Sequence, residues 1–292
     1  MTAYDKKWLD RMYNNRALVP EHAMHFARWK EASEDARLAH SHDADIPYGN
    51  SPLQKLDIFP PSALACAPAS RNGAPVMVFI HGGYWRSLDK SDHSFVAPAF
   101  SNQGACVVVP NYDLCPAVTI PQIVMQMVQA LAWTYRNISR YGGDPNRITI
   151  IGHSAGGHLA AMLLVCQWRS FAKDLPPDLA KGALSISGLY DLEPVSQVPF
   201  LKSDLRLNPA DTFKASPAWL PKPRQGVLYT VAGADESAEF LRHNQLIQQA
   251  WGIKAVPICE AVPHCNHFSV LEELTQPWSR LHQLASRLVT SA

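Results

Sequence analysis

The amino-acid sequence predicts an α/β fold in which a mostly parallel, doubly wound central sheet is flanked by helices. Short, wholly apolar runs such as Val76-Met77-Val78-Phe79-Ile80 are typical of strands that are buried on both faces of a parallel sheet. From residue 75 onward these runs alternate with segments of helical periodicity, which indicates successive β–α units. The chain has 292 residues, a length that single α/β domains reach, so we expect one domain over 1–292.

The N-terminal part precedes this regular pattern. Residues 1–45 are rich in charged and aromatic side chains, and we expect a helical extension with one or two amphipathic faces. Those faces carry Trp8, Met12, His22, His25, Phe26 and Trp29. Residues 54–59 alternate between polar and apolar side chains, as a strand does. Residues 60–74, with Pro60, Pro61, Pro68, Asn72 and Gly73, are expected to form a loop.

The remaining elements follow in order along the chain. Apolar or β-branched runs predict strands at 76–80, 106–109, 147–151, 183–187, 226–231 and 255–259. Helical periodicity predicts helices at 120–140, 158–165, 238–251 and 268–289. Between residues 168 and 220 six prolines break up most of the pattern. A long irregular insertion in a compact fold is usually functional, so we expect 168–220 to resemble a lid over a site.

Composition excludes several classes of function. The net charge is +1, so neither nucleic acid nor an anionic membrane is expected as a partner. Residues 1–10 lack a signal-peptide core and no run is long enough to span a bilayer, which indicates a cytoplasmic protein.

The six cysteines, at 66, 106, 115, 166, 259 and 265, form no Cys-x-x-Cys pair, and we expect buried small hydrophobic residues rather than disulfides or zinc ligands. No metal or other cofactor is expected, and the sequence leaves a homodimer open.

The most informative motif is Gly152-His153-Ser154-Ala155-Gly156, which lies between an expected strand and an expected helix. A serine on such a sharp turn is held in a strained conformation with its hydroxyl lifted clear of the sheet, and the residues around it must be small. Gly152 and Gly156 meet that need. The context therefore predicts that Ser154 is a nucleophile.

A serine nucleophile needs a base, and the base needs a carboxylate that orients it. His264 and His267 both follow the last expected strand; His267 directly precedes the final helix and is preferred, with His264 as the fallback. Asp235 and Glu236 follow the preceding strand, where one carboxylate can cap the next helix and the other can orient the base. The residues around Asp235 and Glu236 do not show which of the two orients the base, although aspartate is the commoner orienting acid.

Backbone N–H groups are needed to stabilise the oxyanion that forms on attack. Ala155 supplies one at the start of the helix after the serine, and Gly83 and Tyr84 supply others in the motif His81-Gly82-Gly83-Tyr84-Trp85, which follows an apolar strand. The alternative is that this motif forms an ordinary glycine turn and has no role in an oxyanion site. The order serine, acid, histidine along the chain is the order found in α/β-hydrolases.

With these motifs the chain resembles the esterase/lipase α/β-hydrolases and, within them, the kynurenine formamidase (arylformamidase) family. The resemblance rests on the His-Gly-Gly-x-Trp form of residues 81–85, on residues 187–194 and on Ala215-Ser216-Pro217, and it extends from about residue 45 to the end. Members of the family carry an acidic residue before Ser-x-Glu-Phe, a pattern that residues 236–240 match. The resemblance thus implies Glu236 as the triad acid, where the family usually has aspartate, with Asp235 as the alternative.

The resemblance implies hydrolysis of an aryl formamide such as N-formylkynurenine to kynurenine and formate, through a formyl-enzyme. The alternative is a carboxylesterase or aryl-acylamidase that acts on small aryl esters or anilides. In either case the partner is a small aromatic amide or ester. Tyr84 and Trp85 are expected to line the substrate pocket. Phe200 and Trp219 are further candidates, for which core packing is an equal explanation.

Overall fold

A mixed eight-stranded sheet forms the centre of the computed structural model, which describes residues 4–63 and 73–292. Within those residues the strand order is β1-β2-β4-β3-β5-β6-β7-β8. The strands are β1 Asp43–Pro47, β2 Lys55–Phe59, β3 Ala74–Ile80, β4 Cys106–Pro110, β5 Gly143–His153, β6 Ala180–Ile186, β7 Val227–Gly233 and β8 Ile258–Val262. Neighbouring strands from β4 to β8 pair in parallel, and β2 pairs antiparallel with both β1 and β4. The α/β-hydrolase fold predicted from the sequence is confirmed.

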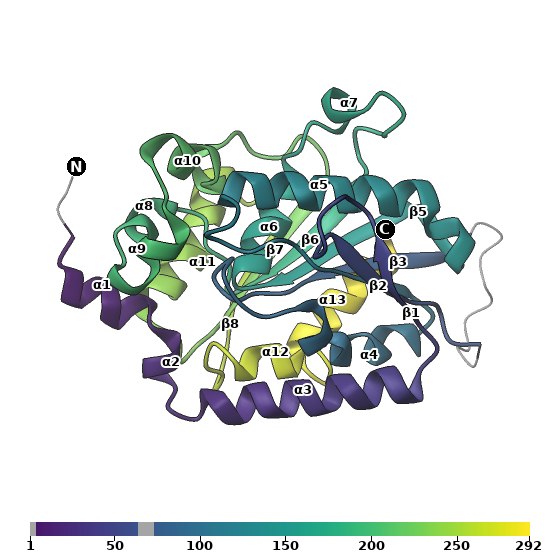
Figure 1. Cartoon of the computed structure of the whole chain (residues 1–292), viewed down its shortest axis with the longest axis horizontal. Coiled ribbons are helices and arrows are strands. Elements are labelled where there is room, and N and C mark those ends of the chain that lie inside the picture. Colours follow the sequence, from purple (N-terminus) through teal and green to yellow (C-terminus); the bar gives the residue numbers. More distant parts are fainter. Residues whose placement is uncertain (1–3, 64–72) are drawn as a thin grey trace.

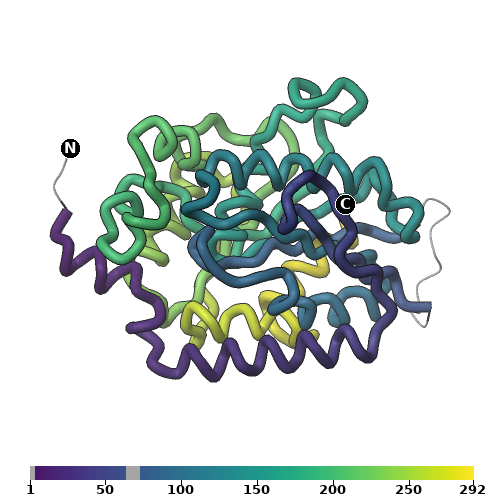
Figure 2. Tube along the Cα trace, in the orientation of Figure 1, coloured from purple at the N-terminus to yellow at the C-terminus, as the bar shows by residue number. Residues whose placement is uncertain are grey.

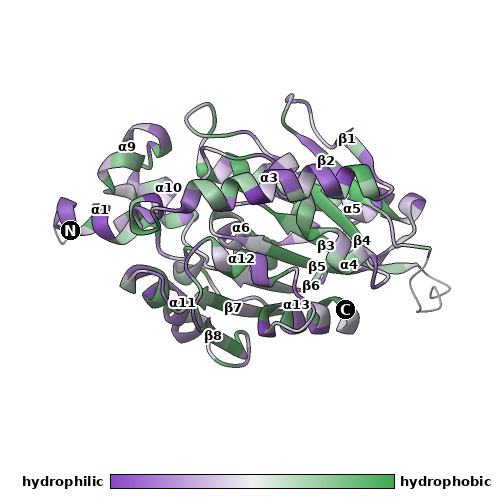
Figure 3. Ribbon diagram, turned by 90° about the horizontal axis from the view of Figure 1, so that it is seen from below, coloured by the Kyte–Doolittle hydropathy of each residue, from purple (hydrophilic) through white to green (hydrophobic). Residues whose placement is uncertain are grey.

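Each central strand contributes to two hydrophobic cores, one on each face of the sheet. In β3, Val76 and Val78 belong to one core, and Met77 and Phe79 belong to the other. This alternation requires apolar residues at every position, which explains the unbroken apolar runs in the sequence. Figure 3 shows the central strands mostly in the hydrophobic colour, between helices of mixed colour.

Helices cover both faces of this sheet (Figure 1). Their bounds are α1 Lys6–Tyr13, α2 Asn15–Leu18, α3 His22–Ala39, α4 Pro98–Ser101, α5 Ile120–Asn137, α6 Ala155–Leu164, α7 Trp168–Phe171, α8 Leu192–Ser196, α9 Pro199–Leu205, α10 Pro209–Lys214, α11 Ala238–Trp251, α12 Ser269–Glu273 and α13 Arg280–Ser291. Short 3-10 helices lie at Lys90–Asp92, Ser94–Val96, Ile138–Tyr141 and Pro217–Trp219. Helices α5, α6 and α11 pack on one core, and α3, α4, α12 and α13 pack on the other.

Proline explains two differences between the expected and the observed C-terminal elements. The last strand begins at Ile258 rather than at residue 255, because Pro257 has no N–H for the ladder, while Ala255 and Val256 close a turn onto Gly252. The helix expected at 268–289 is two helices, α12 and α13, separated at Pro277. The side chain of Ser279 caps the second of them by accepting a hydrogen bond from the N–H of His282.

The N-terminal extension is helical as expected up to Ala39, and it then adds β1 to the edge of the sheet. Figure 2 shows this segment running along one long side of the molecule, beside the C-terminal helices. The N-terminal extension is joined to the C-terminal helices there by a hydrogen bond between His25 of α3 and Glu272 of α12. Residues 1–3, Cys66 and most of the loop expected at 60–74 lie outside the described residues.

The segment 168–220 is more regular than its prolines suggested. Strand β6 passes through it as a central strand of the sheet, and α8, α9 and α10 follow in quick succession. Prolines at positions 199 and 209 start helices rather than break them, because a proline at the first helical position loses no hydrogen bond. Helices α8 and α9 pack against α1. That this segment acts as a lid stays a prediction.

The cysteines in the described ranges carry free thiols. Cys106, Cys115 and Cys265 are buried as expected, whereas Cys166 and Cys259 are half-buried. Burial raises the pKa of the Cys106 thiol to about 12, so this group stays protonated at neutral pH. None of the helices in residues 4–63 and 73–292 combines the length and the apolar character that crossing a bilayer requires.

We expect Gly156→Ala to destabilise the fold, because a Cβ at this position would collide with the backbone carbonyl of Ile80 at the end of β3. Overpacking of this kind costs about 3 kcal/mol of unfolding free energy. Gly142→Ala is the matched control: its Cβ makes only ordinary contacts with Pro61, and its φ of +82° costs about 1 kcal/mol. Urea unfolding followed by circular dichroism measures both values. An equal or smaller loss for Gly156→Ala would contradict the close approach of α6 to β3.

Candidate active site

Ser154 occupies a strained turn between β5 and α6, as the motif predicted. Its backbone has φ +57° and ψ −117°, outside the conformations that are usual for a residue with a side chain. The turn is tight because α6 begins at Ala155, directly after the serine. A Cβ on Gly152 would collide with the carbonyl of Gly156, and a Cβ on Gly156 would collide with the carbonyl of Ile80, so both positions require glycine. The Ser154 side chain lies in the wall of a cavity and is almost fully shielded from solvent.

Two side chains from distant loops form a series of hydrogen bonds that ends at this serine. His267 follows β8 and places its Nε2 3.1 Å from Ser154 Oγ. Its other ring nitrogen, Nδ1, lies 2.6 Å from Glu236 Oε2, and Glu236 follows β7. A carboxylate at Nδ1 keeps the proton on that nitrogen, which leaves Nε2 free to accept the proton of the serine hydroxyl. The three residues therefore form a continuous hydrogen-bonded relay.

The relay contains Glu236, while Asp235 lies outside it. The Glu236 side chain is fully buried, and its Oε1 accepts hydrogen bonds from the Gly233 N–H at 2.7 Å and from the Ser187 hydroxyl at 2.5 Å. Asp235 is exposed, and its backbone N–H donates to the carbonyl of Cys265. The fallback base, His264, is exposed as well. A buried carboxylate is costly unless it is fully hydrogen-bonded, and Glu236 meets that requirement.

His153 supports His267 from the turn itself. Its Nε2–H donates to the backbone carbonyl of His267 at 2.8 Å, and the two rings lie 4.9 Å apart. Burial, with the neighbouring His267, lowers the pKa of His153 well below its ordinary value, so the ring is neutral at physiological pH. A neutral ring has one N–H, and that N–H is the donor of the hydrogen bond to the His267 carbonyl. The sequence motif contained His153, but no local pattern indicated this contact.

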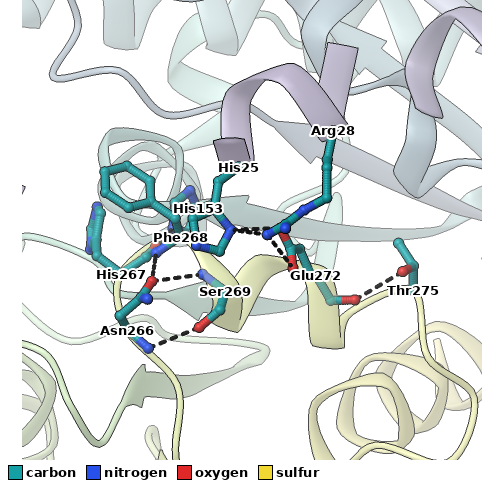
Figure 4. Close-up of polar contacts among 9 residues, drawn as sticks. All are labelled: His25, Arg28, His153, Asn266, His267, Phe268, Ser269, Glu272 and Thr275. Carbon is teal, nitrogen blue, oxygen red and sulfur yellow. Dashed lines mark hydrogen bonds and ion pairs between the residues drawn. The ribbon is translucent and has the colours of Figure 1, made fainter. Parts of the chain in front are cut away.

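The loop that carries His267 is also fixed from the C-terminal side (Figure 4). Asn266 Oδ1 accepts hydrogen bonds from the backbone N–H groups of Phe268 and Ser269, which start α12. Glu272 of α12 lies 2.7 Å from His25 Nδ1 and 3.1 Å from Arg28 Nη2, both on α3. Helix α3 thereby holds in place the helix that begins just after His267.

The expected oxyanion loop lies beside the serine. Gly83, Tyr84 and Trp85 have φ values of +105°, +50° and +56°, so this short segment reverses direction sharply. Within the described ranges, the backbone N–H groups of Gly83, Tyr84 and Ala155 have no hydrogen-bond acceptor. Three N–H groups without acceptors next to a buried serine are what an oxyanion site requires. The Tyr112 hydroxyl, which donates to the carbonyl of His81 at 2.9 Å, holds the start of this loop.

The prediction that Trp85 lines the substrate pocket is wrong. Its side chain is fully buried, and its indole N–H donates to His158 Nδ1 of α6 at 3.2 Å. The sharp reversal at residues 83–85 turns this ring into the core, while Tyr84 remains in the cavity wall. Phe200 also lines the cavity, whereas Trp219 is 40% exposed and packs on Phe213 away from it.

Much of the cavity wall comes from the N-terminal extension, which sequence reasoning did not connect with the site. Besides the serine, the histidine and the oxyanion loop, the cavity is lined by Asn14, Asn15, Arg16, Phe26, Trp29, Arg86, Ser87, Leu88, His153, Phe200 and Phe268. The Tyr84 hydroxyl donates to the carbonyl of Tyr13 at 2.6 Å, and the Ser237 hydroxyl donates to that of Met12 at 2.6 Å. These bonds fasten the segment over the site. The amphipathic pattern indicated that Phe26 and Trp29 pack inward. It did not indicate that they pack around this cavity.

In the part of the chain that the structure describes, no three His, Cys, Asp or Glu side chains converge as metal ligands do.

Comparison with known proteins places this arrangement among hydrolases. The family model BD-FAE matches residues 56–212. Kynurenine formamidase from Danio rerio is 29% identical over 271 residues, which cover 91% of this chain and 88% of the relative. Kynurenine formamidase from Drosophila melanogaster is 29% identical over 69% of each chain. The resemblance that the motifs predicted is thus confirmed.

Solved structures agree with the fold. A structure from a Silicibacter species, described as a candidate thioesterase, is 27% identical, has a TM-score of 0.82 and covers 97% of this chain and 98% of its own. An esterase from Pyrobaculum calidifontis is 19% identical, with a TM-score of 0.68 and coverage of 95% and 97%. At that identity the second likeness concerns the fold alone.

We expect Glu236→Gln to slow the reaction of Ser154 with a fluorophosphonate probe by about 10²–10⁴-fold, because the amide no longer favours the proton on His267 Nδ1 or stabilises the imidazolium. Asp235→Asn is the matched control and should leave the labelling rate unchanged, since its side chain lies outside the relay. The labelling rate constant, followed by gel fluorescence, measures both. A large effect of Asp235→Asn with a small effect of Glu236→Gln would assign the acid to Asp235 instead.

Proposed function

The chain belongs to the BD-FAE family, whose model matches more than half of it, and from this premise we propose that it is a serine hydrolase that cleaves an aryl formamide. The observation that carries the proposal is the buried relay of Ser154, His267 and Glu236, with its spacings of 3.1 and 2.6 Å. Such a relay activates a hydroxyl that is otherwise a weak nucleophile. The formamidase relatives support amide hydrolysis as the reaction class.

In the proposed first step, Ser154 Oγ attacks the formyl carbon while His267 Nε2 takes the hydroxyl proton. The imidazolium that results is stabilised by Glu236, whose two other hydrogen bonds keep it in place. The electron pair of the carbonyl moves to its oxygen, which the N–H groups of Gly83, Tyr84 and Ala155 stabilise. These donors lose no internal hydrogen bond when they bind the oxyanion.

In the second step the tetrahedral intermediate collapses. The C–N bond breaks, its electron pair goes to the aniline nitrogen, and His267 gives that nitrogen the proton taken from serine. The formyl group remains as an ester on Ser154. A water molecule then attacks this ester, with His267 as the base, and formate leaves as the proton returns to Ser154.

The choice of an aryl formamide rests on the relatives and on the cavity wall. Kynurenine formamidase from Danio rerio matches 91% of this chain. Five aromatic side chains line the cavity: Phe26, Trp29, Tyr84, Phe200 and Phe268. Aromatic walls suit an aromatic ring, because offset and edge-to-face contacts add to the burial of apolar area. N-formylkynurenine is a substrate of this class.

A carboxylesterase or aryl-acylamidase is the second candidate. Esterase LipQ from Mycobacterium tuberculosis is 40% identical over 123 residues, which cover 41% of this chain. The same relay and oxyanion donors serve ester cleavage without change, so the acyl group and the leaving group decide between the two functions.

We expect Ser154→Ala to lower kcat for hydrolysis of N-formylkynurenine by about 10⁴–10⁶-fold, because the residue that forms the acyl-enzyme is lost. Ser203→Ala, at an exposed serine on α9, is the control and should leave kcat unchanged. The appearance of kynurenine absorbance measures the rate. Activity of Ser154→Ala within about tenfold of wild type would exclude the serine mechanism.

A comparison of substrates separates the two candidate functions. We expect kcat/KM for N-formylkynurenine to exceed that for phenyl acetate and for acetanilide, because the aromatic wall and the small formyl group are then used together. Acid quench followed by mass spectrometry of the Ser154 peptide should show one added formyl group. A clear preference for the ester or the anilide would replace the formamidase proposal by the second candidate.

A further inference from the structure

The oxyanion loop, residues 81–85, holds a backbone conformation that is unfavourable by itself. Tyr84 and Trp85 have φ values of +50° and +56°, in the left-handed region that residues with a side chain rarely adopt. Two such residues in succession persist only where the contacts around them hold them there. The loop therefore needs an anchor.

The Gly83 carbonyl decides where the next N–H group points. It accepts hydrogen bonds from the backbone N–H groups of Arg86 and Ser87, each at 3.1 Å. Because a trans peptide is planar, the N–H of Tyr84 points the opposite way, and within the described residues it has no acceptor. The orientation of this N–H group thus depends on the turn from Gly83 to Ser87, and Trp85 lies inside that turn.

Trp85 anchors the turn. Its side chain is fully buried, and its indole N–H donates to His158 Nδ1 at 3.2 Å. The two rings meet edge to face, with their centroids 5.0 Å apart and their planes at 90°. The backbone carbonyl of Trp85 accepts a hydrogen bond from the N–H of Cys115 at 2.8 Å. The residue is therefore held through its backbone and through its side chain, and the side-chain bond leads to α6.

His158 joins this anchor to the helix that follows the nucleophile. Its backbone N–H donates to the carbonyl of Ser154 at 3.1 Å, and its Nε2 lies 2.7 Å from the carbonyl of Ala215. Burial lowers the pKa of His158 to about 4, so the ring is neutral at physiological pH. The single ring proton then lies on Nε2, which faces a carbonyl, and Nδ1 accepts from the indole. Both contacts of the ring agree with this one tautomer.

We propose that Trp85 and His158 are positioning residues that set the distance between the two halves of the oxyanion site. One half is the N–H of Ala155, in the same first turn of α6 as His158, and the other is the pair of N–H groups at Gly83 and Tyr84. The inference rests on the proposed serine hydrolase function. Oxyanion donors act only within about 2.7–3.1 Å of the developing charge, so a small shift of one half slows the chemical step more than it weakens substrate binding.

We expect Trp85→Phe to lower kcat for N-formylkynurenine by about 10–100-fold and to leave KM within about threefold of wild type, because phenylalanine keeps an aromatic ring but has no N–H for His158. Trp251→Phe is the matched control: Trp251 is also buried, and its indole N–H donates to the carbonyl of Pro217, outside α6 and the oxyanion loop. The control should keep kcat within about twofold of wild type. An equal fall in the two variants would indicate a general loss of packing and overturn the positioning role.

Two substitutions of His158 separate its two ring contacts. Glutamine places an N–H near the position of Nε2 and keeps the bond to Ala215, but it offers no acceptor at the position of Nδ1. Asparagine places an oxygen near Nδ1 and keeps the bond from Trp85, but it is too short to reach Ala215. We therefore expect His158→Gln to lower kcat by about 10–100-fold and His158→Asn to stay within about threefold of wild type. A fall in His158→Asn as large as that in His158→Gln, or no fall in either, would overturn the proposal.

The double variant tests whether the two residues act through their shared bond. Because Trp85→Phe and His158→Gln remove the same hydrogen bond, the variant with both substitutions should lose about as much kcat as either single variant. A loss equal to the product of the two single losses would show that they act independently, and it would exclude the link. Each rate is measured well below the melting temperature of the variant, so that unfolding does not enter the comparison.

An NMR signal reports the link without any activity. The indole N–H resonance of Trp85, identified by its loss in Trp85→Phe, should shift in His158→Gln and keep its position in His158→Asn. If wild type hydrolyses neither N-formylkynurenine nor phenyl acetate, the hydrolase proposal is wrong, and this resonance still decides whether the link exists. A resonance that His158→Gln leaves in place would refute the link itself, whatever the activity of wild type.

Discussion

The parallel pairing of β3 to β8 is the constraint on which the site depends. In a parallel sheet the carboxyl ends of all strands lie at one edge, so the segments that follow β3, β5, β7 and β8 meet there. These four segments carry the oxyanion loop, Ser154, Glu236 and His267. The parallel ladders bring together groups that are more than a hundred residues apart, and the tight contact of Gly156 with the end of β3 sets where the serine stands within that edge.

Burial of the relay imposes a second requirement, because each polar group withdrawn from water needs a partner inside the protein. Glu236 illustrates this: the Gly233 N–H and the Ser187 hydroxyl occupy one oxygen, and His267 occupies the other. His153 holds the backbone of His267 in turn. Ser154, His267 and Glu236 are thus parts of one hydrogen-bonded network at the ends of four strands, β5 to β8, and the position of each depends on the others.

The N-terminal extension completes the site from outside the sheet. It is joined to the body through hydrogen bonds from Tyr84 and Ser237 and through the contact of α3 with Glu272. Tyr84 therefore has two attachments: its backbone lies in the oxyanion loop, and its hydroxyl holds the segment that walls the cavity. Through this residue the position of the N-terminal wall is coupled to the position of the loop at Gly83 and Tyr84 beside Ser154.

The sequence by itself determined the fold class, nearly all the strands, the strained serine turn and the candidate base, because these depend on local apolar periodicity, on small residues at tight turns and on chain order. It placed the last strand three residues early and joined two helices into one, where Pro257 and Pro277 act on backbone hydrogen bonds. Only the tertiary structure placed Glu236 rather than Asp235 against His267, turned Trp85 into the core and brought Asn15, Arg16 and Trp29 to the cavity. The reason is that these outcomes depend on contacts between residues far apart in the chain and on which side chain is buried, and neither leaves a local pattern.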